Sequence, residues 1–370
     1  MSYSNISFNC TGINRCCAEN IKIDNGKITI YYKDNKIIPN NYNDWKNLNF
    51  LGFKWGWRFN QVNNSIDTNQ LTIKDGQYIM TPSFTRSYIH VWESLIGLFL
   101  IYTENKTIND VYLCNYHENE LECNKELLNF YRYILPNTKF HINSRQVILK
   151  KATLIGRTMI GDMGGFFPSK IEHIKFVDLF LQYYNIPKNT IKNKKPKVYI
   201  IQRKKGNPGR NIINLDDMIK VIERFGCEVI SIDKVYEEMT FKEQIELTRK
   251  VDILIGGHGG GLTNGLFLEK HSAVIEIYPW HFRDSGYSAI NLKVGNYYQS
   301  IQAANHLSIP EPNKLVYLTS QESWRNKVVS QNLLVDLKTF EVVLIQSIDY
   351  IGYHKYNGDL HFTTRYLFKR

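Results

Sequence analysis

The sequence predicts an α/β protein of two domains, one of which is built on a parallel sheet with helices on both faces. The length of 370 residues exceeds the size at which a single hydrophobic core usually stops growing. Hydrophobic residues make up 43% and charged residues 22%, which is typical of a globular protein. From residue 197 onward, short apolar segments alternate with amphipathic segments of helical spacing, the pattern of a doubly wound domain.

The first half of the chain predicts a less regular α/β unit. Strands are expected at 26–34, 110–115 and 145–156, and helices at 88–105, 125–135 and 166–186, the last with Ser169 as its N-cap. The aromatic-rich run 45–60 indicates packed irregular structure. A polar, charged segment bracketed by prolines, 187–197, marks the expected domain boundary.

The second half gives the clearest pattern. Strands are expected at 197–203, 227–233, 252–256 and 272–279, and helices at 214–226, 240–251, 261–270 and 331–351. Gly226 is a favoured residue just past a helix end, and Thr240 with Glu243 fits a capping box. We therefore expect an N-terminal domain over 1–190, a Rossmann-like domain over 191–350, and a C-terminal tail over 351–370 that packs back on the N-terminal domain.

Charge and composition narrow the function classes. The net charge of +11 favours anionic partners, but the basic residues are dispersed and no RRM, KH, zinc or helix-turn-helix signature accompanies them. The six cysteines show no CxxC spacing, which argues against a zinc site. No run approaches the roughly 20 apolar residues that span a bilayer, and the N-terminus has no signal-peptide pattern.

The glycine-rich segment 255–264, IGGHGGGLTN, follows an apolar strand and precedes a predicted helix. Ligands of doubly wound folds bind outside the carboxyl ends of the strands. Unpaired N–H groups at a helix N-terminus attract anions, and glycines let a phosphate approach the backbone and allow positive φ. A tight turn with a core histidine at His258 explains the segment equally well when the loop is taken alone. The loop lacks both the GxGxxG dinucleotide fingerprint and the lysine of a nucleotide-triphosphate loop.

Three charged residues near other strand ends favour an anion site. Arg203 ends the predicted strand 197–203, and Arg210 follows in a Pro/Gly loop. Carboxyl ends of parallel strands meet at one edge, so these guanidinium groups are expected near the glycines, where they could bind phosphate bidentately. Glu276 ends the strand after the loop, where it could accept hydrogen bonds from ribose hydroxyls or pair with an arginine.

These residues together resemble the donor domain of glycosyltransferase family 61, whose members transfer xylose or N-acetylglucosamine. The family pattern has an Arg closing a strand, a second Arg, an Asn, a Phe-x-Glu-Gln helix, a Gly-x-His-Gly-Ala-Gly-Leu-Thr-Asn loop and a strand ending in Glu. The matching residues are Arg203, Arg210, Asn214, Phe241, Glu243, Gln244, Gly256, His258, Gly259, Gly261, Leu262, Thr263, Asn264 and Glu276, with Gly260 at the position of the family's Ala.

The resemblance implies a GT-B-like fold of two Rossmann-type domains facing across a cleft. It also implies a UDP-sugar donor, inversion at the anomeric carbon, no metal and no further cofactor. Asp216–Asp217 is not a DxD metal motif and is expected to stabilise a helix N-terminus. The donor-binding set is Arg203, Arg210, Asn214, His258, Gly259, Gly260, Gly261, Leu262, Thr263, Asn264 and Glu276.

The acceptor hydroxyl needs a general base, which is expected from the opposite domain. Segment 87–100 resembles the family's histidine-containing helix, although Glu93 stands three rather than four residues after His90. With Asp162, these two residues are the candidate bases; each could equally be a structural residue. The partners implied are a nucleotide sugar and a glycan or glycoprotein acceptor.

The alternatives to a transferase are a sugar-nucleotide-binding protein without turnover and a basic nucleic-acid-binding protein. The missing targeting segment predicts a cytoplasmic setting, such as that of a bacterium or a viral factory, or the Golgi lumen if the N-terminus is trimmed.

Overall fold

The computed structural model of the chain forms two compact units. Unit 1 comprises Met1–Met159 with Phe166–Pro168, and unit 2 comprises Ile160–Gly165 with Ser169–Arg370. The structure describes residues 5–7, 15–24, 27–31, 59–62, 72–74, 77–80, 97–99, 102–103, 108–113, 121–142, 147–155, 169–188, 195–203, 209–230, 235–304, 316–317 and 328–356. Over these ranges, no helix combines the length and the apolar character needed to cross a bilayer.

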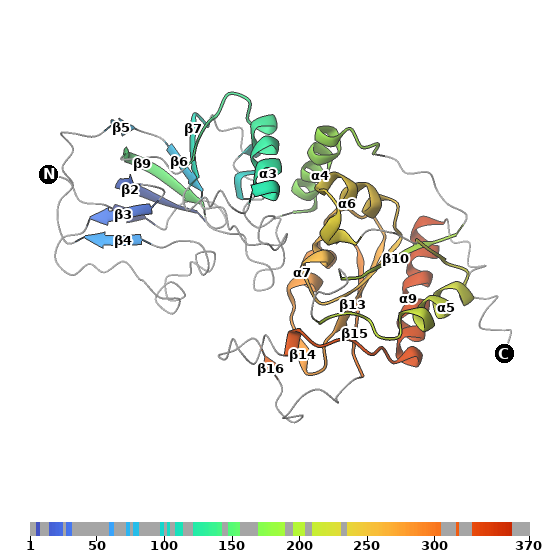
Figure 1. Cartoon of the computed structure of the whole chain (residues 1–370). Coiled ribbons are helices and arrows are strands. Elements are labelled where there is room, and N and C mark those ends of the chain that lie inside the picture. The colour runs from blue at the N-terminus through green and yellow to red at the C-terminus, as the bar shows by residue number, and fades with distance from the viewer. Residues whose placement is uncertain are drawn as a thin grey trace. The chain divides into compact units, whose positions relative to one another are not determined.

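Unit 1 is built on a mixed sheet with the order β4-β3-β2-β9-β6-β7-β8 (Figure 1). The strands are β1 (Asn5–Ser7), β2 (Arg15–Asp24), β3 (Lys27–Tyr31), β4 (Phe59–Val62), β5 (Thr72–Lys74), β6 (Gln77–Met80), β7 (Asp110–Leu113), β8 (Lys139–Ile142) and β9 (Val147–Ile155). Helix α3 (Leu121–Ile134) connects the parallel strands β7 and β8. The structure confirms the predicted strands at 26–34, 110–115 and 145–156 and the predicted helix at 125–135. Of the helix predicted over 88–105, the described residues 97–99 and 102–103 are helical.

The sheet of unit 1 is not all parallel, so the expectation of a second Rossmann-type domain is met only in its β9-β6-β7-β8 half. Strand β2 runs antiparallel to β1, β3 and β9. The physical reason lies in the connection between β2 and β3, which has two residues, whereas parallel strands need a crossover of a dozen or more. The mixed sheet places unit 1 in the α/β class without establishing a GT-B arrangement.

Unit 2 contains the predicted parallel sheet, with the order β11-β10-β12-β13-β15 and every neighbouring pair parallel. Its strands are β10 (Lys197–Ile201), β11 (Glu228–Val229), β12 (Ile253–Gly257), β13 (Ala273–Tyr278) and β15 (Tyr297–Gln302). The register sets Gly256 opposite both Ile201 and Glu276. The carboxyl ends of β10, β12 and β13 therefore lie level with one another, as the anion-site argument requires.

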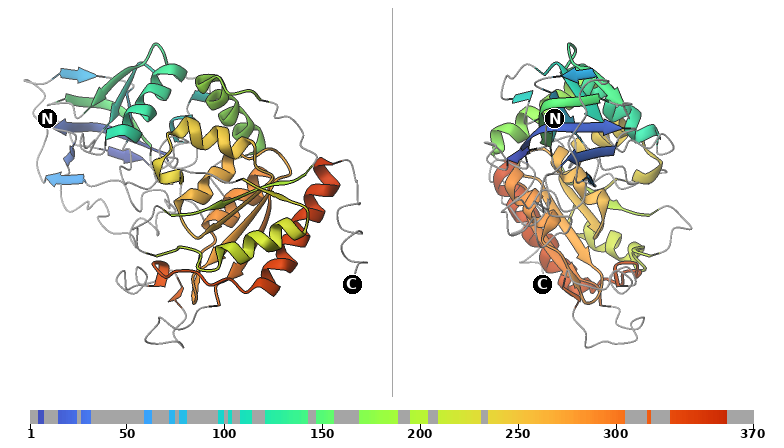
Figure 2. Two further views of the ribbon diagram at one scale, coloured as in Figure 1. Left: turned by 45° about the vertical axis from the view of Figure 1, so that its right-hand side comes forward. Right: turned by 90° about the vertical axis from the view of Figure 1, so that its left-hand side faces the viewer.

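Helices cover both faces of this sheet (Figures 1 and 2). The helices are α4 (Lys170–Tyr184), α5 (Leu215–Arg224), η3 (Tyr236–Glu238), α6 (Phe241–Arg249), η4 (Gly260–Phe267), α7 (Gly286–Val294) and α9 (Leu337–Lys355). Helices α5 and α9 lie on one face, where alternate strand residues such as Val198, Ile255 and Ile275 form a core with them. The opposite face carries α6, η4 and α7, and residues between those alternates, Glu276 among them, point to that side.

Local signals in the sequence explain where several helices begin and end. The Ser169 hydroxyl accepts a hydrogen bond from the Ile171 N–H at the start of α4, and Thr240 with Glu243 forms the complete capping box of α6. Gly226 follows α5 with a φ of 77°, a left-handed conformation that favours glycine. Strand β15 completes the sheet; neither this strand nor helix α7 was predicted.

Helix α4 lies in unit 2, whereas the expected boundary at residue 190 placed it in the N-terminal domain. Its His173 Nε2 lies 2.8 Å from the Leu266 carbonyl of η4, and the ring of Phe180 packs edge-on against Phe267. These buried contacts fasten the helix to the segment that follows the glycine loop. The segment 187–197, which was expected to mark the domain boundary, therefore lies within unit 2.

Residues 351–356, the described part of the expected tail, pack on unit 2. Lys355 Nζ donates to Asp252 Oδ1 at 2.8 Å, and the Tyr356 hydroxyl donates to Asp252 Oδ2 at 3.2 Å. The backbone N–H of Lys197 donates to the same carboxylate at 2.9 Å. Asp252 thus ties the end of α9 to the start of two strands, and residues 357–370 lie outside the described part of the chain.

We predict that Asp252→Ala lowers the free energy of unfolding by about 3 kcal/mol, because it leaves a largely buried ammonium and a strand N–H without their acceptor. Urea unfolding measures the change. Asp349→Ala, which removes an exposed carboxylate from the same helix α9, is the matched control and should change stability by less than about 0.5 kcal/mol. Equal losses in both variants would contradict the role of Asp252.

Candidate functional site: an anion cradle at the glycine loop

The glycine loop joins β12, which ends at Gly257, to η4, which begins at Gly260. The segment after the loop is a 3₁₀ helix over Gly260–Phe267 rather than the expected helix over 261–270. Its first backbone N–H groups, those of Gly260 and Gly261, have no acceptor within the helix. These N–H groups are the hydrogen-bond donors that the sequence predicted at this position. They belong to a 3₁₀ helix, which is tighter than an α-helix.

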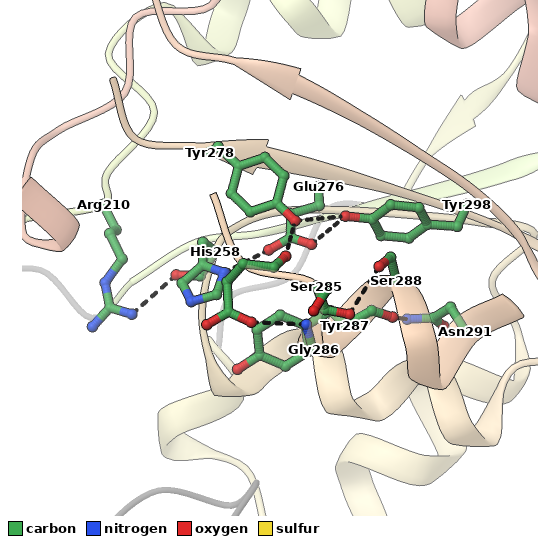
Figure 3. A network of polar contacts seen from close by, with 11 residues as sticks. Arg210, His258, Glu276, Tyr278, Ser285, Gly286, Tyr287, Ser288, Asn291 and Tyr298 are labelled. Carbon is green, nitrogen blue, oxygen red and sulfur yellow. Dashed lines mark hydrogen bonds and ion pairs between the residues drawn. The ribbon is translucent and has the colours of Figure 1, made fainter. Parts of the chain in front are cut away.

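Arg210 lies against this loop. Its Nη1 donates to the His258 carbonyl at 3.0 Å (Figure 3). Its backbone is left-handed, with a φ of 63°, directly after Gly209 with a φ of 76°. The Arg210 N–H donates to the Gln331 carbonyl at 2.7 Å, which fixes this bend. A non-glycine residue held in this region is uncommon and often belongs to a functional site.

Gly259 is required because the guanidinium groups come so close to the backbone. A Cβ at this position would lie 2.8 Å from Arg210 Nη1 and 3.5 Å from Arg203 Nη2. The close approach seen at Gly259 is that of guanidinium groups, and the expected approach of a phosphate to the loop stays a prediction. Among the described residues, the left-handed glycines are Gly209, Gly226 and Gly295, none of which lies in the loop.

The two arginines face the same place and repel each other. Burial, and next the charge of Arg203, lower the pKa of Arg210 to about 10, so the group remains a cation near neutral pH. Arg203 Nη1 lies 3.0 Å from Glu237 Oε1 in a half-exposed pair. Arg210 Nε is buried and has no hydrogen-bond partner among the described residues. An anion between the guanidinium groups would relieve both the repulsion and the unpaired donor.

The His258 side chain reaches Glu276 of β13 through its Nδ1. Its Nδ1 lies 2.6 Å from Glu276 Oε1, and the Tyr298 hydroxyl donates to Glu276 Oε2 at 2.5 Å (Figure 3). Glu276 has no solvent-exposed surface. Of the two partners that the sequence left open for Glu276, an arginine is not found among the described residues, because the carboxylate binds His258 and Tyr298 instead. Hydrogen bonds from a ribose to Glu276 stay a prediction.

Three further residues of the glycine-rich segment, Leu262, Thr263 and Asn264, lie within η4 and are buried. Asn264 Nδ2 donates to Gln244 Oε1 at 3.1 Å and to the Gly261 carbonyl at 3.1 Å. Gln244 in turn donates to the Tyr236 carbonyl at 2.9 Å. Thr263 and Leu262 are completely buried. In this structure these side chains are buried within the protein, and any contact of theirs with a donor stays a prediction.

Asn214 has a structural position as well. Its Nδ2 donates to the Val335 carbonyl at 2.8 Å, and its Oδ1 accepts from the Val335 N–H at 3.0 Å. Both ends of the amide therefore bind the chain segment before α9. Asp216 and Asp217 lie in the first turn of α5, which confirms their expected place at a helix N-terminus.

The three candidate bases, Glu93, His90 and Asp162, lie outside the described residues, and their roles stay predictions. Sequence reasoning missed Tyr278, Tyr287 and Tyr298, whose rings or hydroxyls surround the His258–Glu276 pair. The run of aromatic and polar residues at 297–302 was the one signal for the strand that carries Tyr298.

Comparisons with known proteins find sugar transferases that are similar to parts of this chain. An α-1,3-arabinosyltransferase of Oryza sativa subsp. japonica is 38% identical over 86 residues, which are 23% of this chain and 14% of that protein. An EGF domain-specific O-linked N-acetylglucosamine transferase of Mus musculus is 34% identical over 115 residues, covering 31% and 20% of the two chains. The corresponding protein of Bos taurus is 26% identical over 196 residues, covering 51% and 33%.

The chain thus spans a third or less of the length of these relatives. The family model described as glycosyltransferase 61 matches residues 166–275, which include α4, β10, the glycine loop and the start of β13. The resemblance inferred from the sequence is confirmed over residues 166–275, which are similar to glycosyltransferase 61.

Proposed function

We propose that the chain is an inverting glycosyltransferase that moves a sugar from a UDP-sugar to a hydroxyl of a glycan or protein, without a metal. The observation that carries the proposal is the meeting of two guanidinium groups at Gly259, beside the first N–H groups of η4. The similarity to glycosyltransferase 61 over the same residues gives this anion cradle its context.

A diphosphate suits the cradle chemically. Guanidinium groups bind phosphate oxygens bidentately, and backbone N–H groups at a helix start add further donors. When the bond between the anomeric carbon and the diphosphate breaks, its electron pair passes to the leaving oxygen. Fixed positive groups in a partly buried site stabilise that developing charge. Arg203 and Arg210 supply this charge, which is the role that a metal has in other transferases.

The sugar and the acceptor follow from the resemblance and the relatives. Their names concern arabinose and N-acetylglucosamine, and the family resemblance adds xylose. We propose UDP-N-acetylglucosamine or a UDP-pentose as the donor. Inversion requires a base on the acceptor side, for which Glu93, His90 and Asp162 remain the candidates.

We expect Arg203→Ala to lower kcat/KM for the donor about 100-fold, because it removes half of the positive charge around the diphosphate. Transfer or hydrolysis of UDP-sugars measures the effect. Arg224→Ala is the matched control, since Arg224 is an exposed arginine paired with Glu341 on the outside of α5. Its activity should stay within about twofold of the parent. Unchanged turnover in Arg203→Ala would contradict the assignment of Arg203 to the diphosphate site.

Gly259→Ala should weaken UDP binding about tenfold, because the new Cβ displaces the Arg210 guanidinium. Isothermal titration with UDP measures the affinity. Gly352→Ala adds the same methyl group in α9, where no atom lies within 4 Å, and should leave the affinity unchanged. If UDP binds while no UDP-sugar is turned over, the chain is a sugar-nucleotide-binding protein rather than a transferase.

Activity should persist in excess EDTA, because the positive charge at the diphosphate comes from side chains and backbone. A screen of UDP-sugars with and without EDTA makes this measurement. A loss of activity that manganese restores would contradict the metal-free proposal.

A further inference from the structure

A chain of polar contacts leads from the glycine loop into the sheet. It runs from His258 Nδ1 to Glu276, from Glu276 to the Tyr298 hydroxyl at 2.5 Å, and from there to the Tyr278 hydroxyl at 3.1 Å (Figure 3). The Tyr278 hydroxyl also donates to the Asp284 carbonyl. Only His258 and Glu276 belong to the family pattern; the tyrosines do not.

The carboxylate at the centre of this chain depends on its two donors. Glu276 is fully buried, and a buried carboxylate without hydrogen bonds is costly. Its two oxygens are used separately, one by His258 Nδ1 and the other by Tyr298. The orientation of the carboxylate toward the imidazole is therefore set by the tyrosine on its far side.

The sheet register places Tyr298 for this contact. Glu276 of β13 is opposite Ser300 of β15, so Tyr298, two residues earlier, lies on the same face and diagonally across from it. Partial burial, and next the charge of Glu276, raise the pKa of Tyr298 above its usual range. The hydroxyl consequently keeps its proton and donates a hydrogen bond to the carboxylate.

The imidazole is confined as well as paired. The rings of Phe282, Tyr287 and Tyr278 lie 4.7, 5.1 and 5.8 Å from its centroid, on several sides. Because a carboxylate only accepts, the His258 Nδ1 must carry the proton of their hydrogen bond. Its Nε2 receives no hydrogen bond from the described residues and is the ring atom left for a ligand.

We propose that Tyr298 is a positioning residue for the transfer reaction, which acts through Glu276 to hold His258 with its proton on Nδ1 and its Nε2 toward the bound donor. This inference rests on the proposed function for its kinetic consequence, but the proton position on His258 is a property of the protein alone. The Nδ1 proton stays within the pair throughout, and no proton leaves through the tyrosine.

A double-mutant cycle tests the route of action. Tyr298→Phe should lower kcat about 10-fold with the donor KM nearly unchanged, and Glu276→Gln about 100-fold. These losses are on the order of those seen when the partners that orient metal-ligating histidines are removed. The double variant should be no slower than Glu276→Gln, because the hydroxyl acts only through the carboxylate. Tyr297→Phe is the control. It removes a hydroxyl from the same strand, but on the face toward α9, where Tyr297 stacks on Tyr350. This variant should leave kcat unchanged.

Nitrogen NMR of histidine-labelled protein gives a readout that needs no activity. The parent should show a protected proton on Nδ1 of His258, and in Tyr298→Phe that proton should exchange faster with water while the other histidine signals are kept. A proton on Nε2 alone in the parent, an unchanged Nδ1 signal in Tyr298→Phe, or additive kinetic losses would each overturn the proposal. If the parent cleaves no UDP-sugar, the proposed function fails, and the NMR result alone decides the role of Tyr298.

Discussion

The close approach of the Arg210 guanidinium to the backbone of the glycine loop is the contact on which the candidate site depends. It requires a residue without a side chain at Gly259 and a left-handed bend at Gly209 and Arg210. The bend is held by the segment before α9, where Gln331 accepts from Arg210 and Leu333 bridges to Ile212. The same segment receives both ends of the Asn214 amide. Segments that lie more than 100 residues apart in the sequence thus fix the position of the Arg210 guanidinium group.

The parallel sheet could be predicted because its strands are apolar on both faces and its helices have recognisable ends. Such a sheet also orders its strand ends, so the sequence was enough to bring Arg203, His258 and Glu276 to one edge. The capping box at Thr240 and the glycine at 226 were local signals of the same kind. In unit 1, the antiparallel strand β2 was left unrecognised because polar and charged residues interrupt its apolar ones.

The partners of individual side chains could not be predicted from the pattern. Asn214, Asn264 and Glu276 match family positions, yet each binds a protein group that lies far away in the sequence or on another element. Such choices depend on which polar groups become buried together, and burial is set by tertiary packing. Tyr298 shows the reverse case, since it lies outside every motif and still completes the hydrogen bonds of a buried carboxylate.

A crystal structure of the chain with UDP would show where the diphosphate binds. We expect it between the guanidinium groups of Arg203 and Arg210, with its oxygens against the backbone N–H groups of Gly260 and Gly261. A diphosphate bound elsewhere, with both arginines still turned to their present protein partners, would contradict this expectation.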